Sequence, residues 1–449
     1  MKNDSLDLDT GPILPLLLKM SWPSITAMFA MALYNLIDTF WLARLSSNAI
    51  AALTICFPIQ MALGAIGVGT GVGAGSFAAR MFGARDNVKA SQTAGQVILL
   101  SVLLGILIIV FTLMYHDIIL IIFGATGDII PLSRQYLITV VFGSPFLLFT
   151  MMGNNLLRAE GKPNASMYVI LTMSTVGMIL DPLLIFGWGP IPRLGIQGAA
   201  LSAIISYSIA AFVSFYYLQL RSSKYHLHGR HLIPNPSIIL SIYKTGLPSV
   251  IMNINFSLVL IIYNHVLGYY GTLAIAALGL CFRINQIVVM VLFGIGHGVM
   301  PMVGFNEGAR LYGRLMETVN VGVKLSVIFS VTVFFIYELF AHHLLMLFTN
   351  DADLLTISVP AVRIFITMLL LIGPNLVWIN MFIGLGKGLT SMCLLLARDL
   401  FLLIPMLFIL PIWFGLNGVW MAQPISNLFA FFVIFYWKKR EFAIISKKM

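Results

Sequence analysis

The chain has 449 residues, of which 59% are hydrophobic and 9% are charged, and its formal net charge is +10. A soluble domain carries roughly 25% charged residues, so this composition excludes an ordinary soluble protein and indicates a polytopic membrane protein. Hydropathy predicts twelve spans of all-α structure, at 13–43, 49–79, 90–114, 130–157, 164–188, 195–220, 238–268, 272–303, 318–346, 355–384, 389–411 and 415–437.

The basic residues are distributed unevenly between the two sides of these spans. Twenty of the 26 Lys and Arg residues fall on one side, four on the other, and two inside spans. The positive-inside rule places the crowded side, with both termini, in the cytoplasm. We therefore read the positive charge as a topology signal and expect no nucleic acid partner. The polar start of the chain lacks the pattern of a cleavable signal peptide, and the short loops favour a bacterial inner membrane.

The two halves of the chain resemble each other at an offset of 225 residues. The string AIAAL at 49–53 recurs at 274–278, and GAR at 83–85 recurs at 308–310. Toward the end of each half the offset falls to 220. Two parallel six-helix repeats around a central cavity are predicted. The expected N-terminal lobe, cytoplasmic linker and C-terminal lobe are 1–220, 221–237 and 238–449.

Two acids lie inside predicted spans of the first half, Asp38 in the first span and Asp181 in the fifth. A carboxylate at the bilayer centre costs roughly 2.5–3.5 kcal/mol, so an intramembrane acid is a functional candidate by default. Both spans run outward and both acids have a similar depth, so we expect them to share a polar pocket with Tyr34 and Asn35. These spans contain no arginine, which favours a site for a proton or a cation over a salt bridge. The alternative is that each acid only fixes helix packing.

The second half also carries polar side chains at membrane depth. We expect a structural ion pair between Arg283 and Asp399, with a substrate contact as the alternative. Arg398 is adjacent to Asp399 and is expected to point to a different face. His297, beside glycines, is either a titrating group or a packing residue. The chain shows no GxxxxGK[ST] pattern and no catalytic or metal-ligating motif, so we expect a gradient-driven transporter and not an enzyme.

Five local patterns carry a family resemblance: YNLIDTFWLARLS, GVGAGSFAARMFGARD, LLRAEGKP, ILDPLLIFG and GIQGAALS. Together with the length and twelve spans, they resemble the multidrug and toxic compound extrusion (MATE) transporters, and the two acids resemble those of the DinF-like subgroup. The resemblance implies export of amphipathic, often cationic drugs or toxic metabolites. It places Asp38 and Asp181 in the cation-coupling site. The two-lobed design itself needs only a monomer, with the lipid bilayer and a coupling cation as partners.

The identity of the coupling ion depends on a departure from that subgroup. An asparagine often precedes the span-5 acid by one helical turn, whereas this chain has Gly177. A sodium cage would lose one oxygen ligand there, which favours H⁺, with Na⁺ as the alternative. A lipid-linked sugar or lipid flippase of similar architecture is the alternative function. It would need a cluster of cavity arginines to hold a pyrophosphate.

Overall fold

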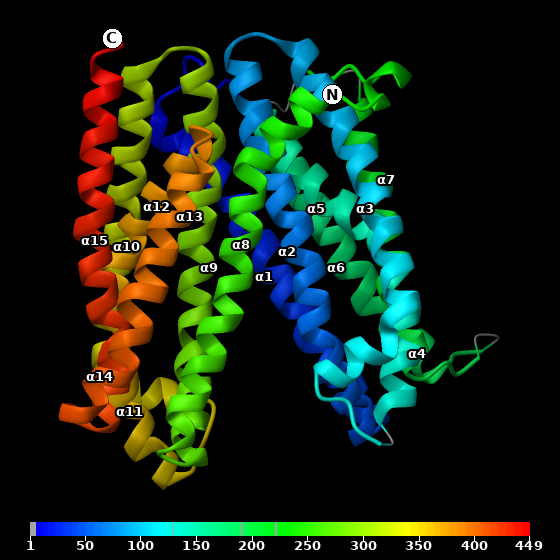
Figure 1. Cartoon of the computed structure of the whole chain (residues 1–449), viewed down its shortest axis with the longest axis vertical. Coiled ribbons are helices and arrows are strands. Elements are labelled where there is room, and N and C mark those ends of the chain that lie inside the picture. Colours follow the sequence, from blue (N-terminus) through cyan, green and yellow to red (C-terminus); the bar gives the residue numbers. More distant parts are fainter. Residues whose placement is uncertain (1–5, 128, 190–191, 221) are drawn as a thin grey trace. The chain divides into compact units, whose positions relative to one another are not determined.

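The computed structural model describes residues 6–127, 129–189, 192–220 and 222–449, and the regular elements in these ranges are helices (Figure 1). Ten of the described helices are long and apolar enough to cross a membrane. Two further pairs of shorter helices, bent by 54° and 47°, raise the number of candidate spans to twelve. The predicted all-α membrane fold is confirmed.

The first half of the chain follows the predicted spans, with one break. Its helices are α1 (Ile13–Leu45), α2 (Ser47–Gly83), α3 (Asn87–Ile122), α4 (Ile129–Val141), α5 (Ser144–Ala159), α6 (Pro163–Phe186), α7 (Ile196–Gln219) and the short 3₁₀ helix η1 (Gly229–Leu232). The span predicted as one helix is the bent pair α4 and α5. The break falls directly before Pro145, which has no amide N–H and therefore begins a new helix more readily than it continues one.

The second half repeats this order of elements. Its helices are α8 (Pro236–Gly268), α9 (Thr272–Gly308), α10 (Tyr312–Met346), α11 (Ala352–Ile366), α12 (Leu369–Gly384), α13 (Gly388–Leu396), the π-helical turn η2 (Ala397–Leu403), α14 (Ile404–Phe414) and α15 (Leu416–Ser446). Here the bent pair is α11 and α12. The span predicted at 389–411 is the continuous run of α13, η2 and α14, which is one candidate span in the structure.

The repeat extends to details of the backbone. Helices α2 and α9 both have 37 residues and begin at Ser47 and Thr272, 225 positions apart. In the described part of the chain, Arg85 and Arg310 are the non-glycine residues with positive φ, and both have φ of 58°. They occupy the same position in the two repeats. The duplication read from the sequence is therefore also a duplication of local conformation.

The chain divides into two compact units, and the division falls inside two helices. Unit 1 contains Thr26–Val250 with the described residues before Leu8, and unit 2 contains Leu8–Ile25 and Ile251–Met449. The boundaries therefore lie within α1 and α8. The segment expected as a linker between lobes, 221–237, belongs to unit 1 in its described residues.

Glycines allow helices to pack closely within each unit. In unit 1, a Cβ on Gly73 of α2 would lie 2.2 Å from the carbonyl oxygen of Ile242 in α8. In unit 2, a Cβ on Gly298 of α9 would lie 2.6 Å from Oγ of Ser21 in α1. Such distances require glycine, because any larger side chain would displace the neighbouring helix. The first part of each of α1 and α8 thus packs on the glycine-rich helix of the other repeat.

The polar segment after α7 is fixed to unit 1 by buried side chains. The amide nitrogen of Gln96 in α3 donates to the carbonyl oxygens of His231 and Ile233, each at 2.8 Å. Its amide oxygen accepts from the backbone N–H of Asn235 at 3.0 Å. One side chain thereby satisfies three backbone groups of a segment that has little regular structure.

A buried ion pair anchors the start of the same segment. Nζ of Lys162 lies 2.8 Å from Oε1 of Glu160, and the two side chains are 5% and 0% exposed. The Glu160 carboxylate also accepts from the Ser223 hydroxyl at 3.1 Å and from the backbone N–H of Lys224 at 2.7 Å. Nζ of Lys162 donates further to the carbonyl oxygen of Ser222 at 3.0 Å. Both charges are therefore compensated by close partners, as a buried pair requires.

Candidate functional site

The two intramembrane acids of the first half come together inside unit 1. Asp38 lies in α1 and Asp181 in α6, and their carboxylates are close enough to interact electrostatically. Asp181 is fully buried, whereas Asp38 is partly exposed. Asp181 is therefore enclosed by protein, whereas part of the Asp38 surface is accessible.

The Asp181 carboxylate is poorly supplied with hydrogen-bond donors among the described residues. Neither of its oxygens accepts a hydrogen bond of standard geometry from the described residues. The hydroxyl of Ser202 in α7 lies within interaction range, but it donates to the carbonyl oxygen of Gly177 at 3.3 Å. Because one hydroxyl proton serves one acceptor well, the Ser202 hydroxyl that donates to Gly177 is not a full donor to Asp181. A buried acceptor without a donor is costly unless another group fills the position.

Tyr34 occupies the space beside Gly177. A Cβ on Gly177 would lie 2.5 Å from Cε2 of the Tyr34 ring, so a side chain at this position would collide with the ring. Tyr34 is buried and its hydroxyl lies within electrostatic range of both acids. The glycine at 177 therefore does more than remove a ligand, since it also makes room for a tyrosine next to the acid pair.

Three further polar side chains surround the pair and were not identified from the sequence. Tyr136 of α4 and Tyr207 of α7 lie within electrostatic range of Asp38. Nε2 of Gln60 in α2 donates to the Tyr136 hydroxyl at 2.8 Å. The only feature of the sequence that could have pointed to these three residues is that each is a polar side chain in an apolar span. Asn35, which the sequence suggested as a supporting group, is exposed.

The charge balance of this site is unusual for a membrane interior. Among the described residues, no lysine or arginine forms an ion pair with Asp38 or Asp181. Two ionised carboxylates without a counter-ion would be strongly unfavourable in a low-dielectric environment. The described residues also contain no group of three His, Cys, Asp or Glu side chains that could hold a metal ion. The described surroundings of the two acids therefore supply no lysine or arginine to balance their charge when both are ionised.

The acid of unit 2 has a different environment. Asp399 lies in the π-helical turn η2, and its Oδ1 is 2.7 Å from Nε of Arg398, while Asn255 of α8 donates to the other oxygen. The sequence suggested that Arg398 and Asp399 would point to different faces and that Asp399 would pair with Arg283. The π-helical turn changes the spacing of successive side chains, and the adjacent arginine forms the pair. The charge of Asp399 is thus compensated by Arg398.

The other two residues of the expected second-lobe site lie apart from this pair. Arg283 is exposed on α9, and no ion pair joins it to Asp399 among the described residues. His297 is half-buried, with its ring centroid 6.2 Å from that of Phe293. Arg283 and His297 are 14 residues apart on α9, roughly 21 Å along its axis at 1.5 Å per residue, so the three expected residues do not form one cluster.

Comparison with known proteins gives the family. The MatE family model matches residues 23–183 and again 248–409, and the two matches begin 225 positions apart. The multidrug export protein MepA of Staphylococcus aureus (strain MSSA476) is 30% identical over 449 residues, covering 98% of each chain. MepA of Staphylococcus haemolyticus (strain JCSC1435) is 28% identical and covers 98% of this chain and 97% of that protein.

Solved structures agree with this assignment. The crystal structure of MATE in the bent conformation is 27% identical, with a TM-score of 0.93 over 100% of this chain and 99% of that one. The outward-facing conformation of a multidrug resistance MATE family transporter of the MOP superfamily is also 27% identical, with a TM-score of 0.91 over 99% of each chain. With two copies of the family model in one all-helical chain and relatives similar over their full length, the protein is a member of the MATE family of transporters.

Proposed function

We propose that this protein exports amphipathic, often cationic small molecules by antiport with H⁺, through alternating access of two lobes. Full-length similarity to proteins named multidrug export protein supports the substrate class. The internal duplication supports a two-lobed transport mechanism, because repeated halves commonly enclose a substrate path. A monomer is sufficient for this architecture.

The observation that carries the coupling proposal is the acid pair in unit 1. Asp181 is fully buried without a hydrogen-bond donor, Asp38 is adjacent and partly exposed, and neither acid has a cationic partner among the described residues. Loading and releasing one positive charge would switch the pair between a neutralised and a repulsive state. Asp38, which is partly exposed, would bind and release the ion. The electrostatic repulsion on the buried Asp181 would fall when the ion is bound and rise when it leaves. The switch would change the packing of α1 against α6 and α7.

Two features favour H⁺ over Na⁺ as the coupling ion. Gly177 supplies no side-chain oxygen, and the Tyr34 ring fills the space in which another ligand would stand. A hard metal cation needs several oxygen ligands, whereas a proton needs a single carboxylate oxygen. Na⁺ remains the alternative ion. The positions of the two acids also lead us to propose membership of the DinF-like subgroup.

We propose a bacterial inner-membrane location with both termini in the cytoplasm. The support is the charge asymmetry of 20 basic residues on one side against four on the other. Within unit 1, Lys162 contacts Ser222, so the basic α5–α6 connection and the basic segment after α7 share one end. Within unit 2, the α9–α10 connection and the end of α15 also share one end, where Arg310 and Lys448 line the same cavity.

The test is ion-coupled drug transport in proteoliposomes with imposed pH and Na⁺ gradients applied separately. Ethidium serves as the cationic probe, and drug-dependent proton flux is recorded with a pH-sensitive dye. We expect transport to follow the pH gradient in the wild type and to fall at least about tenfold in Asp38→Asn and Asp181→Asn, since each loses its ionisable group. Asp117→Asn is the matched control, because Asp117 is a half-exposed acid of unit 1 that pairs with Arg134.

Each outcome of this test has a definite meaning. Transport that follows Na⁺ alone would replace the proton by a sodium ion at the same acids. Wild-type transport in both Asp38→Asn and Asp181→Asn would remove the acid pair from the mechanism. Equal losses in Asp117→Asn would show that any lost acid impairs the protein, and the assignment would then fail.

The flippase alternative is less well supported by the charges of unit 2. An anionic pyrophosphate would need several free cationic side chains at membrane depth. Arg398 is already paired with Asp399, which leaves Arg283 as the exposed arginine near mid-membrane among the described residues of this unit. Transport of a lipid-linked sugar in the same vesicles, without any effect of ethidium, would favour the alternative.

A further inference from the structure

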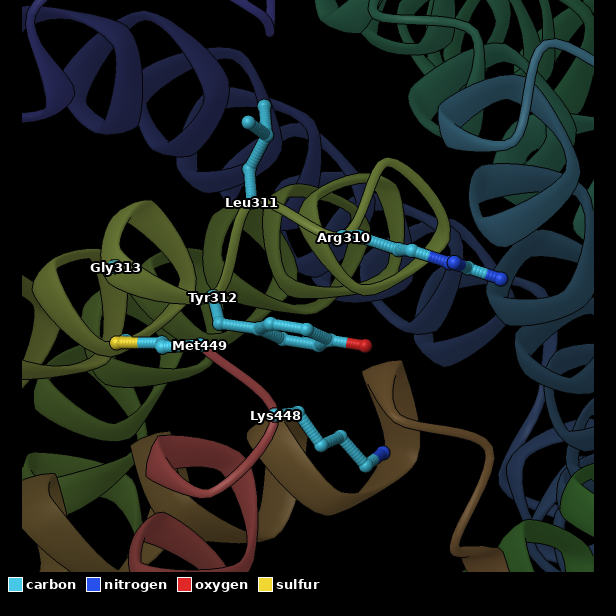
Figure 2. Close-up of a pocket in the computed structure, with 6 residues that line it drawn as sticks. All are labelled: Arg310, Leu311, Tyr312, Gly313, Lys448 and Met449. Atoms are coloured by element: carbon cyan, nitrogen blue, oxygen red, sulfur yellow. The ribbon is translucent and has the colours of Figure 1, made fainter.

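A cavity lies at one end of unit 2, where α9 turns into α10. It has a volume of about 580 Å³ and is lined by Arg310, Leu311, Tyr312, Gly313, Lys448 and Met449 (Figure 2). The transport site proposed above lies in unit 1 and uses none of these residues. The cavity therefore needs an explanation of its own.

Two of the three polar side chains that line the cavity are cationic. Figure 2 shows the side chains of Arg310, Tyr312 and Lys448 extending to the same side, with the tyrosine ring between the two cations. Arg310 is exposed and forms no ion pair with the described residues. Nζ of Lys448 lies 5.6 Å from the Tyr312 ring centroid and 3.6 Å from Oε1 of Glu307. Glu307 is thus the acidic neighbour, and it offsets one of the two positive charges.

The corresponding place in the first repeat already contains an anion. Arg85 has the same φ of 58° as Arg310, and the next residue is Asp86, which caps α3 by accepting from the backbone N–H of Lys89 at 2.9 Å. In the second repeat the residue after Arg310 is Leu311, and α10 begins without a side-chain cap or an acidic residue in its first turn. The first repeat carries a carboxylate at this turn, whereas the second repeat carries a cavity with two cations.

We propose that this cavity binds the phosphate group of an anionic ligand between Arg310 and Lys448. The Arg310 guanidinium can bind two phosphate oxygens side by side, and the Lys448 ammonium adds a second charge. The uncapped amides at the start of α10 face the same turn and favour an anion. The phosphate comes either from the headgroup of an anionic lipid or from a soluble phosphate, and the two sources share this chemistry. Basic pockets at the membrane surface commonly hold anionic headgroups.

The test uses the full-length protein and two phosphate probes. In one arm, the protein is placed in nanodiscs of phosphatidylcholine with a minor fraction of phosphatidylglycerol, and native mass spectrometry counts the retained phosphatidylglycerol. In the other arm, inorganic phosphate is titrated in a neutral detergent at constant ionic strength, and the unfolding temperature is recorded. Sodium chloride replaces the phosphate in the blank.

Three variants and one matched control define the expected pattern. Arg310→Gln and Lys448→Gln should each weaken binding about fivefold, because each removes one cationic contact. Glu307→Gln should tighten binding, because it removes the competing acid beside Lys448. Arg85→Gln is the control, since it changes an arginine of the same backbone conformation at the capped turn of the first repeat. Binding in this control should equal that of the wild type.

The outcomes separate the two sources and can overturn the proposal. Retention of phosphatidylglycerol that depends on Arg310 and Lys448 supports a lipid headgroup, and stabilisation by inorganic phosphate alone supports a soluble ligand. If Arg310→Gln does not fold, the binding measured with Lys448→Gln tests the proposal instead. The Lys448 side chain is 48% exposed and follows the end of α15, so its replacement should not disturb folding. Absence of binding in both arms overturns the proposal, as does an equal loss in Arg85→Gln.

Discussion

Replacing Glu160 by glutamine should destabilise unit 1 strongly while preserving side-chain shape. The carboxylate accepts hydrogen bonds from Lys162, Ser223 and the Lys224 backbone, and its side chain is fully buried. Glutamine keeps one acceptor oxygen and turns an N–H₂ group toward donors. Lys162 then remains buried with only the Ser222 carbonyl as a close acceptor.

The magnitude follows from the loss of one member of a buried pair. Such a loss costs about 3–5 kcal/mol, because the remaining charge is left desolvated without compensation. At roughly 2–4 °C per kcal/mol for a unit of this size, the unfolding temperature should fall by about 10 °C. Thermal unfolding in detergent, followed by tryptophan fluorescence, measures the shift. Trypsin cleavage at Arg230 reports whether the segment after α7 has come loose.

The second repeat supplies the matched control. Lys387 corresponds to Lys162 and pairs with Glu441 of α15, but its side chain is 42% exposed. The Glu441 side chain is only 10% exposed, but the Lys387 ammonium that would lose its partner stays solvated. Glu441→Gln should therefore cost less than Glu160→Gln, about 1 kcal/mol. Equal shifts in the two variants would refute the argument from burial. An unchanged unfolding temperature in Glu160→Gln would show that the buried pair contributes nothing.

Two other predictions concern the acid pair and a helix cap. Gly177→Ala should cost about 1–3 kcal/mol by overpacking, since its Cβ would lie 2.5 Å from the Tyr34 ring, and adding Tyr34→Leu should recover much of the thermal stability. A double variant no more stable than Gly177→Ala would contradict this packing. Asp86→Ala should cost about 1 kcal/mol through loss of the α3 cap. The backbone N–H of Lys89 lowers the pKa of Asp86, so the cap is fully present above pH ~4 and is lost as pH falls through the lowered pKa. Wild type and Asp86→Ala should converge in unfolding temperature under acid conditions, and a constant difference would contradict this origin.

Much of the architecture could be predicted because a membrane leaves few choices for the backbone. Apolar runs that cannot expose N–H groups to lipid must be helical, so hydropathy placed the spans well. Hydropathy could not find the breaks before Ser144 and Leu369, since a bent pair is as apolar as a straight helix. The sequence also could not predict that the boundary between the two units falls within α1 and α8. The residues of a helix do not indicate which neighbouring helices its two ends contact.

The candidate site was only partly accessible from the sequence. A carboxylate in an apolar run is conspicuous, so Asp38 and Asp181 stood out. Tyr136 and Tyr207 did not, because tyrosine is common in membrane helices and its role depends on which helix faces the acids. The prediction that Arg398 and Asp399 point to different faces was wrong, because it assumed α-helical spacing. Asp399 lies in the π-helical turn η2, where successive side chains are spaced differently.

The division within α1 and α8 has a consequence for how the protein can be assembled. A fragment ending at residue 220 would lack the part of α8 that covers Gly69 and Gly73 of α2, and the converse fragment would lack the part of α1 that covers Gly294 and Gly298 of α9. Each fragment would expose a groove shaped for a helix it does not contain. Two fragments expressed together could supply the missing segments to each other. A single repeat could be complete only by exchanging these segments with a second copy, and in the duplicated chain the same exchange takes place between the two repeats.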